Sequence, residues 1–453
     1  MKRLLVIFAL LLSISIIFTG CQSGTSETVG TKKLSNEYES IVRGYALELL
    51  SFNNTKMGFK AAGSEADFKS AAYIVEEMKE IGLTNVTKEE ITLDGWDVKD
   101  AVLTIFCGCT EEGKLDVKSV GYYPTNMDFE NENFRLYDIA DGTELQYQGK
   151  DVKGQLVILS TSENLLESIE LAKEKGVAGI IVSSGLETYV STSIVENLPV
   201  DMPILAVSRN SLNIVRQYKV DDYVDVVLTA YSKVTEDVKT YNVVGEIEGK
   251  NKNKVIYITA NRDGLYKDFM GSGVSVGELF LIANELVESG YKPESTIKFV
   301  VTTGQEWGKV GKTENEGIKA QLESNVSWVE NAKAVIVLDG SYPLKDTVNT
   351  ATQGSSEVVE FLTKYNKNFT DNGYRFKNSI SEISGGRVTE ALVWVDYGVP
   401  TILQAEPKDS AFSKIEKNSG DLASLTIDNE QLNFLVDYYT NMIKEIDRVK
   451  SFK

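Results

Sequence analysis

The sequence predicts an α/β fold in which a mixed sheet carries helices on both faces. Apolar runs of strand length alternate with helical segments, and the alternation is clearest after about Glu236. Strands and helices that alternate at this spacing build parallel or mixed sheets with a helical layer on each side. The 453 residues suffice for more than one domain, and 42% hydrophobic with 25% charged residues is an ordinary globular composition.

The first predicted helix begins at a capping box. The sequence SEAD at 64–67 puts a hydroxyl and an acid at the helix start, and Gly82 ends the helix. We expect its buried face to consist of Phe68, Ala71, Ala72, Val75 and Met78. Two separate strands are predicted next, at 85–93 and 101–109.

A second group of elements follows a loop-like stretch that begins at about Val117. The predicted elements are a strand at 155–159, a helix at 164–175, a strand at 177–182, a strand at 202–207 and a helix at 211–217. The first three make a βαβ unit.

The third group has longer elements. They are predicted as a strand at 255–260, a helix at 276–288, strands at 297–302, 334–338 and 401–404, and a helix at 426–444. Ligands of such sheets bind at the carboxyl ends of the strands, so the residues directly after these strands are the candidate site residues.

Composition excludes several classes of function. The chain contains no histidine, which removes Ser-His-Asp and Cys-His hydrolases, histidine-ligated zinc or haem, and histidine general bases. It has 47 basic and 66 acidic residues, for a net charge of −19, and this charge argues against nucleic-acid binding.

Residues 1–20 are typical of an export signal, with Lys2 and Arg3 followed by an apolar run at 4–18. The ending FTGC at 18–21 resembles the bacterial lipobox, whose cysteine is lipidated and becomes the new N-terminus. This resemblance implies a lipoprotein anchored to the cell membrane through Cys21 on the extracytoplasmic face, with a flexible linker at 21–35. An uncleaved signal anchor is the alternative.

Two further cysteines, Cys107 and Cys109, are separated by one residue. We expect two buried thiols here, because a disulfide across one residue is strained. A redox or metal-binding pair is the alternative.

Several motifs carry a family resemblance. The motifs YNVVG at 241–245, GYKP at 290–293 and GQEWG at 304–308 resemble the co-catalytic di-zinc exopeptidases, a family that includes bacterial aminopeptidases, glutamate carboxypeptidase and the transferrin receptor. The motifs AGSE at 62–65 and GVP at 398–400 extend the resemblance. It implies a zinc-exopeptidase-like fold for residues 36–116 and 237–453.

The stretch 117–236 is similar to the protease-associated (PA) domain, a smaller α/β domain often inserted in these proteins. The motifs KGQLV at 153–157 and KGVAG at 175–179 carry this likeness. We therefore expect an inserted PA domain between the two parts of the peptidase-like domain.

The family's metal positions can be assigned from the resemblance. In active members two zinc ions need a bridging carboxylate, terminal His and carboxylate ligands, and a Glu that deprotonates the bound water. The first strand ends in a ligand His that is followed two residues later by Asp, and here these positions are Asn261 and Asp263. The bridging Asp falls at about Gly271.

The remaining family positions follow the next strands. The Glu-Glu pair of base and ligand is Gln305-Glu306, and the next ligand Asp matches Asp339. The final ligand is a His after Ser-Asp, for which the nearest likeness places Gly386. Only Glu306 and Asp339 keep a ligand carboxylate, so the resemblance implies an inactive member with no metal and no cofactor.

Other constellations are weaker. The GxSxG pattern at 273–277 precedes a helix, but no histidine exists to activate Ser275. A Ser-Lys dyad with Lys267 or Lys309 stays formally open. Residues 271–273 could hold an anion, or could simply form a tight turn that needs glycine. The ligand-cleft candidates are Arg262, Asp263, Ser272, Glu306, Asp339 and Arg387.

The leading hypothesis is a membrane-anchored lipoprotein whose peptidase-like domain binds a peptide, a protein or a small carboxylate. One alternative is an active aminopeptidase or hydrolase with an atypical metal or a rebuilt site, using Asp263, Glu306 and Asp339 around another cation. The other is a surface scaffold that acts through the PA domain.

Overall fold

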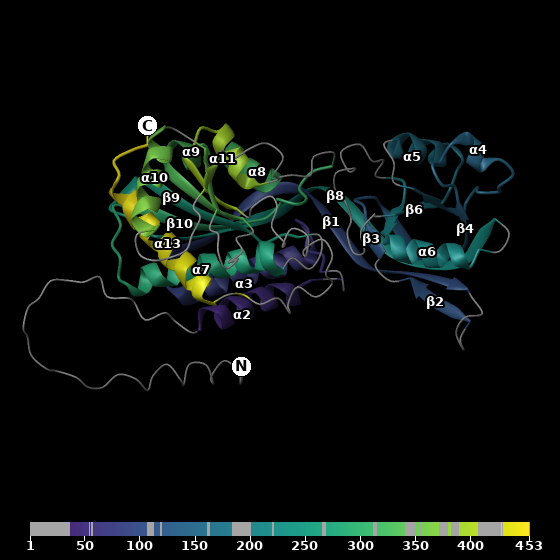
Figure 1. Cartoon of the computed structure of the whole chain (residues 1–453), viewed down its shortest axis with the longest axis horizontal. Coiled ribbons are helices and arrows are strands. Elements are labelled where there is room, and N and C mark those ends of the chain that lie inside the picture. Colours follow the sequence, from purple (N-terminus) through teal and green to yellow (C-terminus); the bar gives the residue numbers. More distant parts are fainter. Residues whose placement is uncertain are drawn as a thin grey trace, which may run out of the picture. The chain divides into compact units, whose positions relative to one another are not determined.

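The computed structural model describes residues 37–53, 55, 58–106, 113–117, 120–160, 164–183, 201–219, 222–264, 269–310, 315–339, 349–353, 356–370, 379–381, 389–405, 427 and 429–452. Within these residues the strands form a mixed sheet with helices on both faces, which confirms the predicted fold class (Figure 1). Cys21, Cys107 and Cys109 lie outside the described residues, so the predictions for them stay predictions.

The elements of the first half follow in chain order. They are α2 (Tyr38–Ser51), α3 (Glu65–Ile81), β1 (Thr84–Phe106), β2 (Lys114–Val117), β3 (Val120–Tyr122), β4 (Met127–Asp138), α4 (Glu144–Tyr147), β5 (Leu156–Leu159), α5 (Leu165–Glu174), β6 (Gly179–Ser183), β7 (Ile204–Val207), α6 (Arg209–Gln217) and β8 (Tyr223–Ile247). Strands β5 to β7 and helices α5 and α6 agree with the predicted elements within three residues.

The elements of the second half continue from β8. They are β9 (Asn251–Asn261), the π-helix η2 (Phe269–Val274), α7 (Ser275–Glu288), β10 (Ser295–Thr302), α8 (Glu316–Ser324), α9 (Ser327–Glu330), β11 (Ala332–Asp339), β12 (Asn349–Gln353), α10 (Ser356–Thr370), β13 (Ser379–Ser381), α11 (Glu390–Asp396), β14 (Thr401–Ala405) and α13 (Asn429–Arg448). Among the described residues, no helix is both long enough and apolar enough to span a membrane.

The sheet is parallel at the strands that matter for the site. In the described part of the chain its order is β13-β12-β14-β11-β9-β10-β8-β4-β5-β6-β7-β3, and β1 pairs with both β8 and β2. Strands β14, β11, β9 and β10 run parallel to one another, whereas β8 is antiparallel to β10. The carboxyl ends of β9, β10, β11 and β14 therefore meet at one edge of the sheet.

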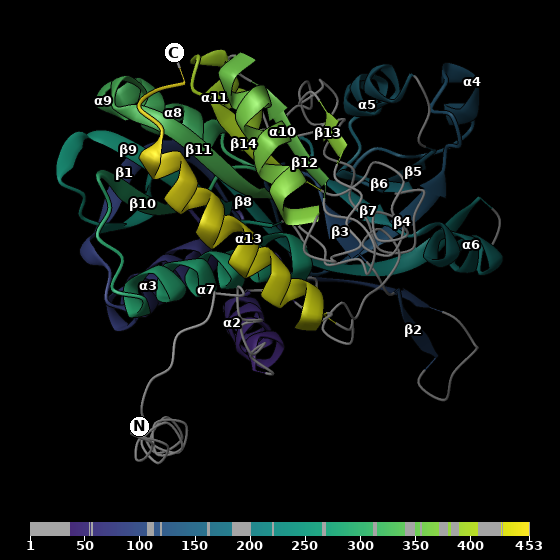
Figure 2. The ribbon, with the colours of Figure 1, turned by 60° about the vertical axis from the view of Figure 1, so that its left-hand side comes forward.

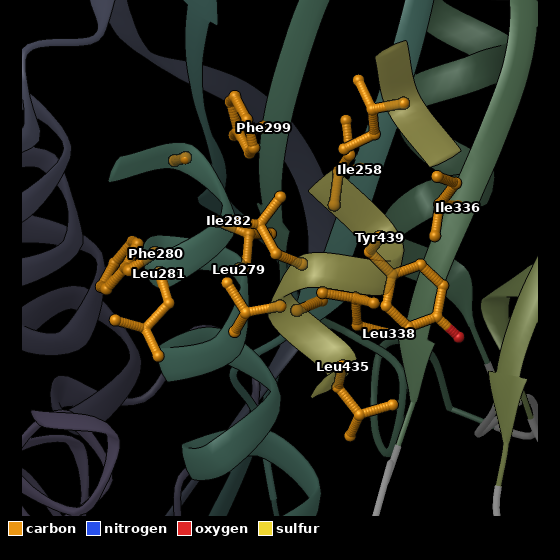
Figure 3. Close-up of a cluster of buried hydrophobic side chains, with 14 of the residues drawn as sticks. Ile258, Leu279, Phe280, Leu281, Ile282, Phe299, Ile336, Leu338, Leu435 and Tyr439 are labelled. Carbon is orange, nitrogen blue, oxygen red and sulfur yellow. The ribbon is translucent and has the colours of Figure 1, made fainter. Parts of the chain in front are cut away.

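One face of these strands is covered by α2, α3, α7 and α13 (Figures 1 and 2). Figure 3 shows Ile258 and Ile336 of the strands facing Leu279 and Ile282 of α7, with Leu435 of α13 beside them. These side chains are at most 2% exposed. Burying such side chains stabilises the fold by about 1.5–3 kcal/mol for each one relative to an exposed position.

The opposite face is covered by α8, α9 and α11, which lie above the sheet in Figure 1. Here Tyr257 of β9 packs against two indoles, at 5.0 Å from the ring of Trp328 and 5.1 Å from that of Trp394. This aromatic layer fixes α11 over the ends of the central strands.

Helix α3 begins where the capping box predicts. The Ser64 hydroxyl accepts from the Asp67 N–H at 3.2 Å, and Gly82 ends the helix with φ at 94°. The predicted buried face is wrong in part, because Phe68 is 38% exposed and Ala72 is exposed, whereas Ile74 is buried. Phe68 instead packs edge-on against the ring of Tyr241, 6.4 Å away.

The N-terminal strands differ most from the prediction. The two expected strands at 85–93 and 101–109 are one strand, β1, which pairs with β8 along most of its length. Irregularities between Leu93 and Gly95 and between Lys99 and Val102 let the ladder continue through polar residues. Strands β4 and β8 were not predicted, because charged residues interrupt their apolar pattern. The predicted boundary at 236/237 falls within β8.

Gly317, near the start of α8, supplies a test of this packing. A Cβ at Gly317 would lie 1.6 Å from the carbonyl oxygen of Thr303, whereas a Cβ at Gly44, within α2, meets nothing within 4 Å. We expect Gly317→Ala to lower the free energy of unfolding by about 3 kcal/mol or more. Gly44→Ala is the matched control and should raise it by up to about 1 kcal/mol, since alanine is the better helix former. Denaturant unfolding measures both, and equal stabilities would contradict this packing.

Candidate functional site

The carboxyl ends of three neighbouring parallel strands bring most of the predicted site residues together. Asn261 ends β9 and lies opposite Thr302 in the ladder with β10, and Asp339 ends β11 on the other side of β9. Gln305 and Glu306 occupy the turn that follows β10. The candidate site is therefore a cluster of carboxyl and amide groups at one edge of the sheet.

Asp263 holds the turn after β10. Its two carboxylate oxygens accept from the backbone N–H groups of Gln305, at 3.2 Å, and Glu306, at 2.9 Å, and its side chain is fully buried. Burial raises the pKa of Asp263 to about 6, even though the two N–H donors lower it. Its role in this structure is to position the turn rather than to face a ligand.

Two amide side chains stand at the strand ends. The Asn261 amide nitrogen donates to the backbone oxygen of Asp263 at 3.2 Å. The Gln305 amide nitrogen points to Asp339, whose nearer carboxylate oxygen lies 3.5 Å away, a long hydrogen bond. Both amides therefore act as donors to groups of the site itself.

Arg262, expected in the ligand cleft, lies in the interior instead. Its guanidinium pairs with the Asp67 carboxylate at 2.8 Å, and both side chains are 0% exposed. It also donates to the backbone oxygens of Tyr241, at 2.7 Å, and Val301, at 3.2 Å. These contacts leave Arg262 unavailable to a bound ligand and make it a structural cation.

The glycine-rich turn before α7 belongs to the packing of α2. Gly271 and Ser272 lie in the π-helix η2, and Ser272 is buried. A Cβ at Gly273 would lie 2.9 Å from the Cβ of Ala46 in α2, so glycine is needed there for close approach. This packing favours the structural interpretation of the turn over an anion site.

Three predicted candidates fall outside the described residues. They are Gly386, Arg387 and Lys267. The structure does describe two residues of the Ser-Lys dyad considered above. Ser275 is fully buried in α7, and Lys309 is exposed. A buried hydroxyl and an exposed ammonium do not make a nucleophile and its base.

Glu390 belongs to this cluster but was not predicted. It lies in the first turn of α11, is 2% exposed, and accepts hydrogen bonds from the hydroxyl groups of Thr259 and Thr302, the latter at 2.7 Å. Burial raises the pKa of Glu390 to about 7, and the nearby carboxyl groups of Asp339 and Asp263 add to the rise, while the two hydroxyl donors oppose it. In the sequence, Thr389-Glu390 resembles an ordinary helix start, which hides this role.

The comparisons with known proteins fit this geometry. Residues 242–420 match the profile of peptidase family M28. The matched residues include the strand ends and the turn after β10. This part of the chain is similar to peptidase family M28. This match confirms the predicted resemblance to the zinc exopeptidases. No curated protein matches the sequence.

Several solved structures share the fold. BSAP, a zinc aminopeptidase from Bacillus subtilis, aligns with a TM-score of 0.65 at 16% identity over 89% of this chain and 95% of its own. A peptidase M28 precursor from Shewanella amazonensis aligns with a TM-score of 0.65 at 17% identity over 91% and 95%. An aminopeptidase from Aneurinibacillus sp. strain AM-1 gives a TM-score of 0.56 at 13% identity over 92% and 98%. At such identities the likeness shows the fold alone.

Two acids of this region are bound by its own backbone and hydroxyl groups. In the part of the chain that the structure describes, no group of three or more Cys, Asp or Glu side chains is arranged to hold a metal ion. Asp263 is engaged by two N–H groups, and Glu390 by two hydroxyl groups. Both carboxyl groups carry a proton over part of the mildly acidic range.

These two raised pKa values predict a pH dependence of stability. The folded state binds protons at Asp263 and Glu390 more tightly than the unfolded chain does, so this stabilisation is complete below about pH 4 and is lost as the pH rises through 6 and 7. We expect the free energy of unfolding to fall between pH 5 and pH 8. The full effect is roughly 3 kcal/mol for each group.

Glu390→Gln should flatten this dependence, because the amide cannot titrate. Glu132→Gln is the matched control, since Glu132 is exposed and its replacement removes the same formal charge. Urea unfolding at pH 5, 6, 7 and 8 measures the slope for all three proteins. A slope in Glu390→Gln equal to that of the wild type would show that Glu390 does not titrate in this range.

Proposed function

We propose that this M28-like domain binds a peptide or protein segment at its strand ends and does not hydrolyse it. The observation that carries the proposal is the chemistry of Gln305 at the position of the family's general base. Its amide cannot accept a proton at neutral pH, and it donates toward Asp339, one of the two carboxylates left at metal positions.

The residues at the family's zinc positions do not fit a zinc pair. Asn261 replaces a histidine and uses its amide nitrogen as a donor within its own turn, and Gly271 has no side chain to bridge two metals. Glu306 and Asp339 remain, which is one carboxylate for each metal. Zinc sites in proteins use three or four ligands, so this donor set supports a domain without its metals.

The final histidine position is better assigned to Ala391 than to Gly386. The family's ligand follows Ser-Asp, and Thr389-Glu390 keeps the order of a hydroxyl and a carboxyl residue directly before Ala391. Glu390 also contacts the ends of β9 and β10 through Thr259 and Thr302. This assignment puts an apolar methyl group where active members have a ligand.

A peptide fits the site better than a small carboxylate does. A free carboxylate would meet the acidic groups of Glu306 and Asp339, and Arg262 is held by Asp67. A peptide offers backbone N–H groups or an ammonium group to these acids and carbonyl groups to amide donors. We therefore assign the peptide, rather than the small carboxylate, as the ligand class.

Zinc binding and turnover test this proposal. The purified protein, incubated with excess zinc and desalted, should hold well under one zinc ion per chain by elemental analysis and should not hydrolyse aminoacyl p-nitroanilides. The variant with Asn261→His, Gly271→Asp, Gln305→Glu and Ala391→His is the positive control, and it should retain more zinc than the wild type. Stoichiometric zinc with turnover in the wild-type protein would overturn the proposal.

We also propose that the chain is an extracytoplasmic lipoprotein and that residues 117–236 are an inserted PA domain. The lipobox-like ending at 18–21 supports the first statement, and the βαβ unit with its KGQLV and KGVAG motifs supports the second. The anchor would hold the peptide-binding domain at the outer face of the cell membrane.

The lipid attachment depends on Cys21. In cells fed an alkyne fatty acid, the wild-type protein should be labelled and should remain with the membrane fraction. Cys21→Ser should abolish the label and leave the precursor unprocessed, whereas Cys107→Ser is the matched control and should behave as the wild type. Equal labelling of the Cys21 variant would exclude this anchor.

A further inference from the structure

A hollow on strands β4 and β8 lies apart in sequence from the strand-end residues. Its volume is about 530 Å³, within the range of about 300–1,000 Å³ that ligand pockets have. It is lined by Phe106, Asn133, Phe134, Arg135, Gln155, Asp225 and Val226. The set combines two aromatic rings, one guanidinium, two amides and one acid.

Arg135 is the centre of this hollow. Its guanidinium carbon lies 4.7 Å from the centroid of the Tyr223 ring, and that ring packs against Tyr137 at 5.5 Å. Among the described residues Arg135 forms no ion pair, whereas Asp138, three residues further along the chain, pairs with Arg216 at 2.7 Å. Stacking holds the plane of the guanidinium, a side-chain hydrogen bond to Tyr137 uses one of its donors, and the remaining N–H groups lie along its edge.

Amide groups surround this cation. Gln155 accepts from the Arg135 backbone N–H at 2.7 Å through its side-chain oxygen. Its amide nitrogen makes no hydrogen bond to any residue that the structure describes. Asn133 is exposed two residues before Arg135, and therefore lies on the same face of β4. The hollow thus presents several N–H donors on one side.

The ring of Phe106 forms the apolar wall. Phe106 is 39% exposed, and it follows Ile105, which opposes Val226 in the ladder, so its side chain lies on the same face as those of Asp225 and Arg135. Phe134 lies on the other face of β4, where it packs against the core. The ammonium group of Lys114 lies 5.5 Å from the centroid of the Phe106 ring and adds positive charge. Asp225 opposes Arg135 in the ladder, and no ion pair joins the two.

We propose that this hollow binds the C-terminal residue of a polypeptide that ends in a hydrophobic side chain. A C-terminal residue carries a carboxylate and a side chain on the same carbon, which matches a cation beside an apolar wall. The Arg135 fork would take the carboxylate in a bidentate contact, the amide donors would take the preceding carbonyl, and the Phe106 ring would cover the side chain. An internal Asp or Glu lacks the apolar group beside its carboxylate.

Peptide titration by calorimetry tests the site in the purified full chain. The probe is N-acetyl-Gly-Phe as the free acid, compared with its C-terminal amide and with N-acetyl-Gly-Gly as the free acid. We expect saturable binding of the first probe and at least about tenfold weaker binding of the other two. Arg135→Gln should weaken binding of the first probe by at least about tenfold, and Phe106→Ser should weaken it as well.

Arg209→Gln is the matched control, because Arg209 is also exposed and, among the described residues, also forms no ion pair. It should bind within about twofold of the wild type. Thermal unfolding should show that both arginine variants keep their fold. Equal affinity for acid and amide, unchanged binding in Arg135→Gln, or no saturation up to about 10 mM would overturn the proposal. If the probe bound at the strand ends instead, Arg135→Gln and Arg209→Gln would bind it equally well. The comparison of these two variants therefore distinguishes the two sites.

Discussion

The ion pair between Asp67 and Arg262 holds the start of α3 against the ends of the central strands. Neither side chain is exposed, and the pair survives burial because almost every polar atom in it finds a partner. Arg262 donates to the backbone of Tyr241 and Val301, and Asp67 accepts from the hydroxyl group of Thr303 at 2.8 Å. Removing one partner of such a pair typically costs about 3–5 kcal/mol, because the other charge stays buried.

This ion pair also explains how the strand-end site keeps its shape. Arg262 directly precedes Asp263, so fixing the one also fixes the other. Asp263 then holds the turn of Gln305 and Glu306 through two backbone N–H groups. Here Asp263 and Glu390 are neutralised in part by protons, since burial raises the pKa values of both.

The sequence was sufficient to predict the central strands but not the contacts between distant segments. Strands such as β9 and β11 are buried on both faces and appear as continuous apolar runs, which periodicity detects. Strands β1 and β8 alternate polar and apolar residues, which is typical of half-buried strands, but charged stretches such as 233–239 in β8 break the alternation and resemble loops. The pairing of Asp67 with Arg262 joins residues far apart in the chain, and nothing local to either residue encodes it. Glu390 follows a threonine at an ordinary helix start, so the sequence does not indicate that it belongs to the site.

Arg262 and Arg135 show that a position directly after a strand is a weak guide to whether an arginine binds a ligand. Arg262 follows the end of a strand, where ligands of α/β proteins bind, yet burial obliges it to take Asp67 and two carbonyl groups as partners. Arg135 lies in a strand that the sequence did not predict, and it is exposed and stacked on Tyr223, so no acid is needed to keep it in place. An arginine whose plane is fixed by an aromatic ring retains its hydrogen-bonding edge for a carboxylate. The position of a cation relative to solvent, rather than its position along a motif, therefore decides which arginine is available to a ligand.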